Sequence, residues 1–189
     1  TEAVVSTIVS DNYDAGVQCA KDMMKKKTSA NIIIVNQKAL NSINERVKGF
    51  RDTIKGHPQY KIVEEKESAA EFEIAMKVME EIIYEKKNYD VVMGGNDPIA
   101  LGCIAAMQMT DKTDQVMVYG VDGSPDGKAM IKAGFLEGTA AQSPIKIGEK
   151  AVQTAYSYLA GETVKKHVTI PVELITADNL KLYDMTGWQ

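Results

Sequence analysis

The sequence predicts an α/β fold, in which a doubly wound parallel sheet carries helices on both of its faces. Short runs rich in β-branched residues alternate with longer segments in which apolar residues recur at helical spacing. Three of the longer segments also open with a capping residue followed by proline. Strands and helices in this order are typical of βαβ units, and 189 residues with 44% hydrophobic content suffice for one sizeable core.

The predicted strands are short, and polar or turn-forming residues bound each of them. Six follow one another through the first three quarters of the chain, and a seventh lies near its end. They cover residues 4–9, 31–35, 60–63, 90–93, 116–121, 136–141 and 168–175.

The predicted helices have recognisable start signals. Residues 12–27 form an amphipathic pattern behind Asp11, a residue type that commonly caps helices. Ser42 and Glu45 have the spacing of a capping box. Later helices start with a capping residue before proline, whose φ angle is preset and whose missing N–H costs nothing in the first turn. These pairs are Asp97-Pro98, Ser124-Pro125 and Ser143-Pro144.

Composition and motifs argue against several classes of protein. The net charge is −4 and no long basic run occurs, so we do not expect nucleic acid as a partner. No apolar stretch approaches the roughly 20 residues that span a bilayer. Cys19 and Cys103 are expected to be buried thiols, and His57 and His167 are isolated, so we expect no metal site and no cofactor. Hydrolase, P-loop and dinucleotide motifs are absent, so we expect no catalytic residues and no enzyme.

Polar side chains follow the predicted strands at the edge where sheets of this kind bind ligands, outside the carboxyl ends of the strands. Asn96, Asp122 and Gln142 come at the ends of the fourth, fifth and sixth strands. Arg46 lies near the start of the second helix, and Phe72 follows the third strand. Together they offer donors, an acceptor pair, two amides and an apolar ring, a set that suits a neutral polyol or sugar.

Arg46 and Phe72 also have purely structural interpretations. A lone helical arginine is most often solvated, and Arg46 has Glu45 and Asp52 within pairing distance along the helix. A phenylalanine near a helix start most often packs in the core, which is the alternative for Phe72.

The other three candidates have structural alternatives too. Asp122 is followed by glycine, a pair that is common in turns, and Gln142 has the position of a residue that bridges two backbone segments. Asn96 has the weakest alternative, because Asp97 is expected to cap the following helix and leaves Asn96 free for a loop or a ligand.

Six motifs make the chain resemble the C-terminal lobe of ribose-type sugar-binding proteins of ABC importers, which have the two-lobe type I periplasmic-binding fold. The similarity covers essentially the whole chain and keeps the order of the family's motifs. They are VSTIVSDN at 5–12, NERVKGF at 44–50, GNDPIALG at 95–102, VYGVDGSPDG at 118–127, GTAAQSPIKIG at 138–148 and VELITADN at 172–179.

The resemblance implies roles for the five candidates. In the family this lobe gives the sugar an arginine, an aromatic residue, an asparagine, an aspartate and a glutamine. The matching positions here are Arg46, Phe72, Asn96, Asp122 and Gln142, with Phe72 in surroundings that match only loosely. The implied ligand is a monosaccharide such as ribose, the implied partner is an ABC permease, and the implied location is the periplasm or, for a lipoprotein, the cell surface.

The resemblance also implies a division of the chain. Residues 1–143 correspond to the sugar-binding lobe with its first hinge strand, 144–168 to a crossover helix that packs on an N-terminal lobe missing here, and 169–189 to a return strand and tail. The crossings at Ser10, Gln142 and near Pro171 correspond to the hinge. The helix over 144–160 has an apolar face without an obvious cover, so we expect it to fold onto another part of the chain or to mediate self-association.

Two other functions remain as alternatives. The effector-binding domain of a LacI-type transcription regulator shares this fold and would use the same crevice, but it requires an upstream DNA-binding helix-turn-helix. An enzyme on the same sheet would need a nucleophile–base pair or a metal set, and the motifs show neither.

Overall fold

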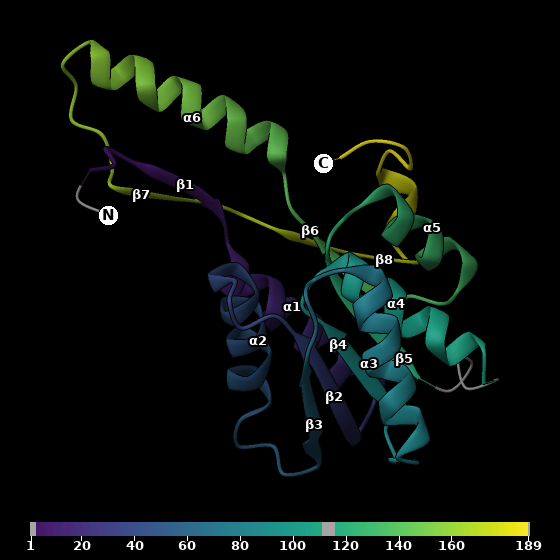
Figure 1. The fold of residues 1–189 in the computed structure, drawn as a ribbon. Helices are drawn as coiled ribbons and strands as arrows, with labels where there is room; N and C mark the ends of the chain where they lie inside the picture. Colours follow the sequence, from purple (N-terminus) through teal and green to yellow (C-terminus); the bar gives the residue numbers. More distant parts are fainter. Residues whose placement is uncertain (1–2, 111–115, 189) are drawn as a thin grey trace.

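The main body of the protein is a six-stranded sheet with helices on both faces (Figure 1). The computed structural model describes residues 3–110 and 116–188. The strand order is β3-β2-β4-β5-β6-β8, and every neighbouring pair is parallel except β6 with β8. The predicted doubly wound fold is confirmed, with one antiparallel edge strand that the sequence analysis did not anticipate.

Strands and helices alternate along the chain as predicted. The strands are β1 (Thr7–Ser10), β2 (Ala30–Asn36), β3 (Tyr60–Glu67), β4 (Val91–Gly94), β5 (Met117–Asp122), β6 (Gly138–Ala141), β7 (His167–Ile170) and β8 (Glu173–Thr176). The helices are α1 (Asn12–Lys26), α2 (Asn41–Ile54), α3 (Phe72–Tyr84), α4 (Asp97–Gln108), α5 (Pro125–Ala133), α6 (Pro144–Leu159) and the short 3₁₀ helix η2 (Leu180–Leu182).

Three strand predictions were wrong in their extent. The first strand begins at Thr7 and not at residue 4. The third strand runs on to Glu67, because β2 continues to pair with it through Asn36. The strand predicted over 168–175 is two strands, because Pro171 has no N–H to donate and interrupts the pairing. The first part, β7, pairs with β1, and the second, β8, pairs with β6.

The central strands are covered by α1 and α2 on one face and by α3 and α4 on the other (Figure 1). The side chains of β2 and β4 have no contact with solvent from Ile32 to Val35 and from Val91 to Met93. Continuous apolar runs of this kind are what a parallel sheet buried on both faces requires. Within the described ranges no helix is both long and apolar enough to cross a membrane.

A second unit, formed by β1, β7 and α6, projects from the body (Figure 1). Its two strands pair in parallel, with Thr7 opposite His167. The apolar face of α6 stays open to solvent, since Val152, Tyr156 and Leu159 are 57%, 72% and 80% exposed. The expectation that this face folds back onto the chain was therefore wrong for the described residues, and self-association stays a prediction.

The helix caps agree only in part with the sequence signals. Asp11 and Ser124 accept hydrogen bonds from the first-turn N–H groups of α1 and α5, as predicted. The capping box is wrong, because α2 already begins at Asn41, which places Ser42 inside the first turn. Ser143 holds the N-cap position of α6 without a side-chain hydrogen bond. These differences shift helix starts by a residue without changing the order of elements.

Candidate functional site

Asp122 ends β5 at the carboxyl edge of the sheet, where its backbone takes an unusual conformation. Its φ angle is 144°, a value that residues with a Cβ atom rarely adopt, and Gly123 follows with a φ angle of 71°. Such strain persists only where the surroundings enforce it, and it gathers at binding and catalytic sites. The turn directs the Asp122 carboxylate to the side chains that follow the neighbouring strands.

Arg46 reaches this carboxylate from α2 and is itself buried, with 4% of its surface exposed. Its Nη1 lies 3.4 Å from Asp122 Oδ1 and donates to the carbonyl oxygen of Gly95 at 2.9 Å. Its Nε donates to Asn12 Oδ1, also at 2.9 Å. The interpretation of Arg46 as a solvated helical residue paired with Glu45 or Asp52 is wrong, because its partners lie across the fold.

Gln142 links Asp122 to the first strand. Its Nε2 donates to Asp122 Oδ1 at 2.7 Å, and its Oε1 accepts from the hydroxyl of Ser10 at 2.8 Å. Next to this bridge, the N–H of Asp11 donates to the carbonyl oxygen of Ile170 at 2.9 Å. The three crossings between the body and the projecting unit are thus tied to one another by hydrogen bonds.

Asn96 and Asp97 exchange the roles that the sequence predicted for them. Asn96 is the N-cap of α4, with Oδ1 accepting from the N–H of Ile99 at 3.0 Å, while its Nδ2 lies 3.5 Å from the carbonyl oxygen of Ala70. The Asp97 carboxylate accepts instead from Ser124 and Thr139, with three donor distances of 2.6–2.9 Å. Asp97 cannot cap α4 because these donors hold both of its oxygens.

Among the predicted site residues, Asn96 joins this cluster only through its neighbour Gly95, whose carbonyl oxygen accepts from Arg46, whereas Phe72 is not brought to it. Phe72 opens α3, is 39% exposed, and lines a separate hollow of about 320 Å³ with Leu101, Ala105 and Met130. The lining of that hollow does not include Arg46, Asp122 or Gln142. The exposure of Phe72 contradicts the alternative of core packing.

Burial governs the electrostatics of the cluster. Desolvation, together with the nearby charge of Asp97, raises the pKa of Asp122 to about 6 against the attraction of Arg46. Desolvation also raises the pKa of Asp97, while its hydrogen bonds from Ser124 and Thr139 oppose that rise. One buried guanidinium therefore faces two carboxyl groups, an arrangement that does not favour an anionic ligand.

The cluster offers donors and acceptors together on a small surface. The Asp122 carboxylate accepts, the amides of Gln142 and Asn96 do both, and Arg46 orients Asp122. A neutral molecule with several hydroxyl groups needs such an alternation. The described residues contain no group of three or more histidine, cysteine, aspartate or glutamate side chains placed to hold a metal ion.

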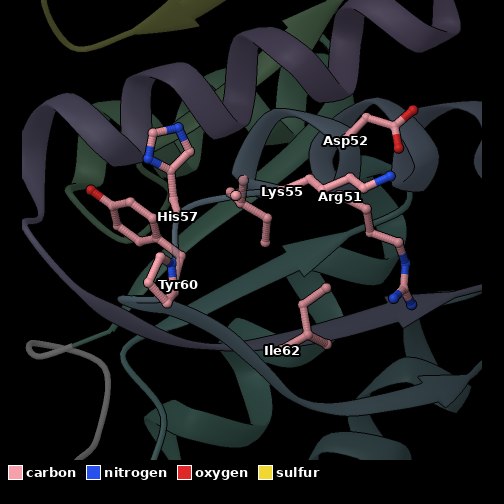
Figure 2. Close-up of a pocket in the computed structure, with 9 residues that line it drawn as sticks. Arg51, Asp52, Lys55, His57, Tyr60 and Ile62 are labelled. Carbon is pink, nitrogen blue, oxygen red and sulfur yellow. The ribbon is translucent and has the colours of Figure 1, made fainter.

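A second hollow, of about 500 Å³, lies at the other end of β3 (Figure 2). The side chains of His57 and Tyr60 stand on one side of it, with Arg51 opposite, and Ile62 forms part of its floor. Arg51 is already paired with Glu65 of the same sheet edge. This hollow is far from the strand ends that carry the Asp122 cluster, and we do not assign the site to it.

Three residues of the cluster were missed by sequence reasoning. Asn12 and Asp97 looked like ordinary helix-start residues, and Ser10 was expected only as a hinge crossing. A polar triplet after the first strand, residues 10–12, was the available signal for Ser10 and Asn12. No local signal separates Asn96 from Asp97, because both residue types cap helices well.

Comparison with known proteins gives the same family from sequence and from structure. The model of the periplasmic binding protein domain matches residues 1–163. The ribose import binding protein of Salmonella typhimurium is 31% identical over 175 residues, which cover 91% of this chain and 58% of that protein. The D-apiose import binding protein of Paraburkholderia graminis is 31% identical over 189 residues, 98% of this chain and 60% of that protein.

Two solved structures of similar fold contain bound myo-inositol. A solute-binding protein of an ABC transporter from Bacillus halodurans, with bound myo-inositol, superimposes with a TM-score of 0.90 at 26% identity, over 96% of this chain and 64% of that one. The Caulobacter myo-inositol binding protein gives a TM-score of 0.84 at 28% identity, over 92% and 60%. The chain spans less than two thirds of the length of these proteins. Its fold, the extent of the match and the shared sequence show that the chain belongs to the periplasmic binding protein domain family.

Proposed function

We propose that this chain forms one wall of a cleft that binds a monosaccharide or a related polyol, as part of the solute-binding protein of an ABC importer. The observation that carries the proposal is the hydrogen-bonded cluster of Arg46, Asp122 and Gln142 at the carboxyl edge of the sheet. Relatives named for ribose and D-apiose import, and similar structures with bound myo-inositol, support this ligand class.

The chemistry of the cluster suits binding without reaction. An ionised Asp122 accepts hydrogen bonds from two hydroxyl groups, and charge-assisted bonds of this kind are about twice as strong as neutral ones. The amide groups of Gln142 and Asn96 already bond within the protein, and each keeps a second N–H and a second lone pair for the ligand. We infer that the protein captures its ligand and changes conformation on binding, and that it is not an enzyme.

The complete protein would contain a second lobe that this chain does not span. We infer that the ligand closes between the two lobes, that an ABC permease recognises the closed form, and that both lie at the periplasmic or outer side of the membrane. In this arrangement residues 1–143 form the sugar-binding lobe, 144–168 cross to the second lobe, and 169–189 return. The exposed face of α6 would pack on that second lobe, and on a second copy of the chain when the lobe is absent.

An NMR titration tests the proposal. The ¹⁵N-labelled chain is titrated with ribose, allose and myo-inositol up to tens of millimolar, because half a cleft binds weakly. We expect the amide signals of Asp122, Gln142 and Asn96 to shift with a common midpoint, and the shifts to vanish in Asp122→Asn.

A matched control is Asp178→Asn, which changes an exposed aspartate of the β8–η2 turn. Its titration should equal that of the unchanged chain. Shifts that survive in Asp122→Asn, or that appear only away from this edge of the sheet, would place the ligand elsewhere and overturn the proposal.

A further inference from the structure

The residues that follow η2 return to the candidate site and are fastened there by a buried lysine. Lys128 of α5 has no exposed surface, and its Nζ donates to the carbonyl oxygens of Asp184 and Gly187, the latter at 2.6 Å. The Asp184 carboxylate in turn accepts from the N–H and the hydroxyl of Thr186, both at 2.9 Å. Residues 183–188, which we name the closing segment, are thus held in a defined conformation.

Leaving the buried Lys128 ammonium without hydrogen-bond acceptors would cost folding free energy. A buried ammonium without acceptors is strongly unfavourable, and here two backbone carbonyls of the closing segment supply them. Burial lowers the pKa of Lys128, and the charges of Asp184 and Asp97 oppose this. The lysine and the closing segment therefore stabilise each other, and the segment stays docked while α5 is folded.

Docking brings Trp188 beside Gln142. A hollow of about 250 Å³ is lined by Trp188, Gln142, Pro144 and Ile147. The end of the described chain lies between α5 and α6, near the carboxyl end of β6 (Figure 1). Gln142 is the residue that hydrogen-bonds Asp122, so the hollow and the Asp122 cluster share this residue.

We propose that Trp188 is a wall of the ligand site and supplies the aromatic surface that Phe72, lining another hollow, does not. This inference rests on the proposed function and adds a specificity-determining residue to it. A sugar ring has a polar edge of hydroxyl groups and an apolar face of C–H groups. Gln142 and Asp122 would bind the edge while the half-exposed indole, 48% accessible, packs against the face. A volume just below the roughly 300–1,000 Å³ of common ligand pockets suits a single ring.

The test uses the fact that Trp188 is the chain's one tryptophan. Its fluorescence is recorded while the 189-residue chain is titrated with ribose, allose and myo-inositol, and the Asp122 amide shift is followed by NMR in the same samples. We expect the emission to change with the midpoint of the Asp122 shift. Trp188→Ala should raise the Kd about tenfold, the equivalent of about 1.4 kcal/mol, while Trp188→Phe should stay within about threefold.

Two further variants test whether the docked closing segment, and with it Trp188, contributes to sugar binding. Lys128→Met keeps the buried methylenes and releases the closing segment, and it should weaken sugar binding as much as Trp188→Ala does. Leu182→Ala changes a 75% exposed residue just before the segment and should leave the Kd unchanged. Circular dichroism checks that each variant is folded, and Trp188→Leu replaces Trp188→Ala if the latter is not.

The outcomes distinguish this inference from the proposed function. A sugar that shifts Asp122 but leaves the emission and the Trp188→Ala Kd unchanged would overturn the role of Trp188 and keep the sugar site. If no sugar shifts Asp122 in the unchanged chain, the proposed function fails and this inference fails with it. An emission change without an Asp122 shift would place the ligand against Trp188 alone and would overturn the shared site.

Discussion

Gly16 of α1 lies in backbone contact with Arg46 of α2. A Cβ atom on Gly16 would stand 1.8 Å from the carbonyl oxygen of Arg46 and 2.7 Å from the nitrogen of Phe50. Gly49 makes the reciprocal contact, since its Cβ would stand 2.0 Å from the carbonyl oxygen of Tyr13. The close crossing of the two helices therefore sets how far Arg46 projects toward Asp122.

Gly16→Ala should separate the two helices. The methyl group meets backbone atoms, which cannot rotate away, so we expect a loss of at least about 1–3 kcal/mol in the free energy of unfolding. Sugar binding should weaken at the same time, because Arg46 moves with α2. Urea denaturation measures the first effect and the NMR titration the second.

Gly148→Ala is the matched control, a glycine-to-alanine change on α6. A Cβ atom there meets no atom within 4 Å, and alanine favours the helix, so stability should rise by about 0.5–1 kcal/mol. Equal effects of the two substitutions would show that the α1–α2 contact is looser than the structure has it.

Arg46→Met should destabilise the protein by about 3–5 kcal/mol, because it leaves a buried carboxylate without its cation. The pKa of Asp122 should rise further, since the attraction of Arg46 is the main influence that opposes its desolvation. Thermal and urea unfolding measure the first change. Arg51→Met is the comparison: its pair with Glu65 is partly exposed, so at most about 1 kcal/mol should be lost. A small effect at Arg46 would contradict its role as the buried partner of Asp122.

Sugar affinity should fall as the pH drops through about 6, because protonated Asp122 loses its charge-assisted hydrogen bonds.

The free energy of unfolding should change in the opposite direction with pH. The pKa of Asp122 in the folded protein lies above its ordinary value of 3.8, so between these values the folded state binds the proton more strongly than the unfolded state. The contribution of Asp122 to stability therefore rises as the pH is lowered from about 7 to about 4.

The carboxyl carbon of Asp122, followed by ¹³C NMR against pH, gives its midpoint directly. Asp122→Asn cannot titrate at this position, so the stability of the unchanged chain minus that of the variant should increase as the pH falls. A midpoint near 4, or a difference that does not depend on pH, would show that the carboxylate is not desolvated.

The chain should self-associate at high concentration through α6, because Val152, Tyr156 and Leu159 expose a contiguous apolar face. Val152→Lys with Leu159→Lys should shift the chain to monomers in sedimentation velocity runs. Met109→Lys alters another exposed apolar residue, 73% accessible at the end of α4, and should leave the association unchanged. A monomer at all concentrations would remove this prediction without affecting the sugar site.

The order of strands and helices could be predicted because residues close together in the sequence determine it. Examples are the apolar runs around Ile33 and Val92, and caps such as Asp11 and Ser124. The convergence of Arg46 with Asp122 and Gln142 followed from the rule for strand ends. What failed depends on contacts between distant residues. Asp97 does not cap α4 because Ser124 and Thr139 donate to its oxygens. Trp188 lines a hollow with Gln142 at the end of a segment that Lys128 binds. No neighbouring residue carries that information.

The pairing of β1 with β7 has a consequence for synthesis. All of the helices α1 to α6 and the strands β2 to β6 are encoded between these two partners. During synthesis β1 cannot pair with β7 until nearly every other described element of this chain has been made. Unpaired strand edges are prone to join other chains. A nascent chain stalled before His167 would therefore expose an edge of β1 that the finished chain covers with β7.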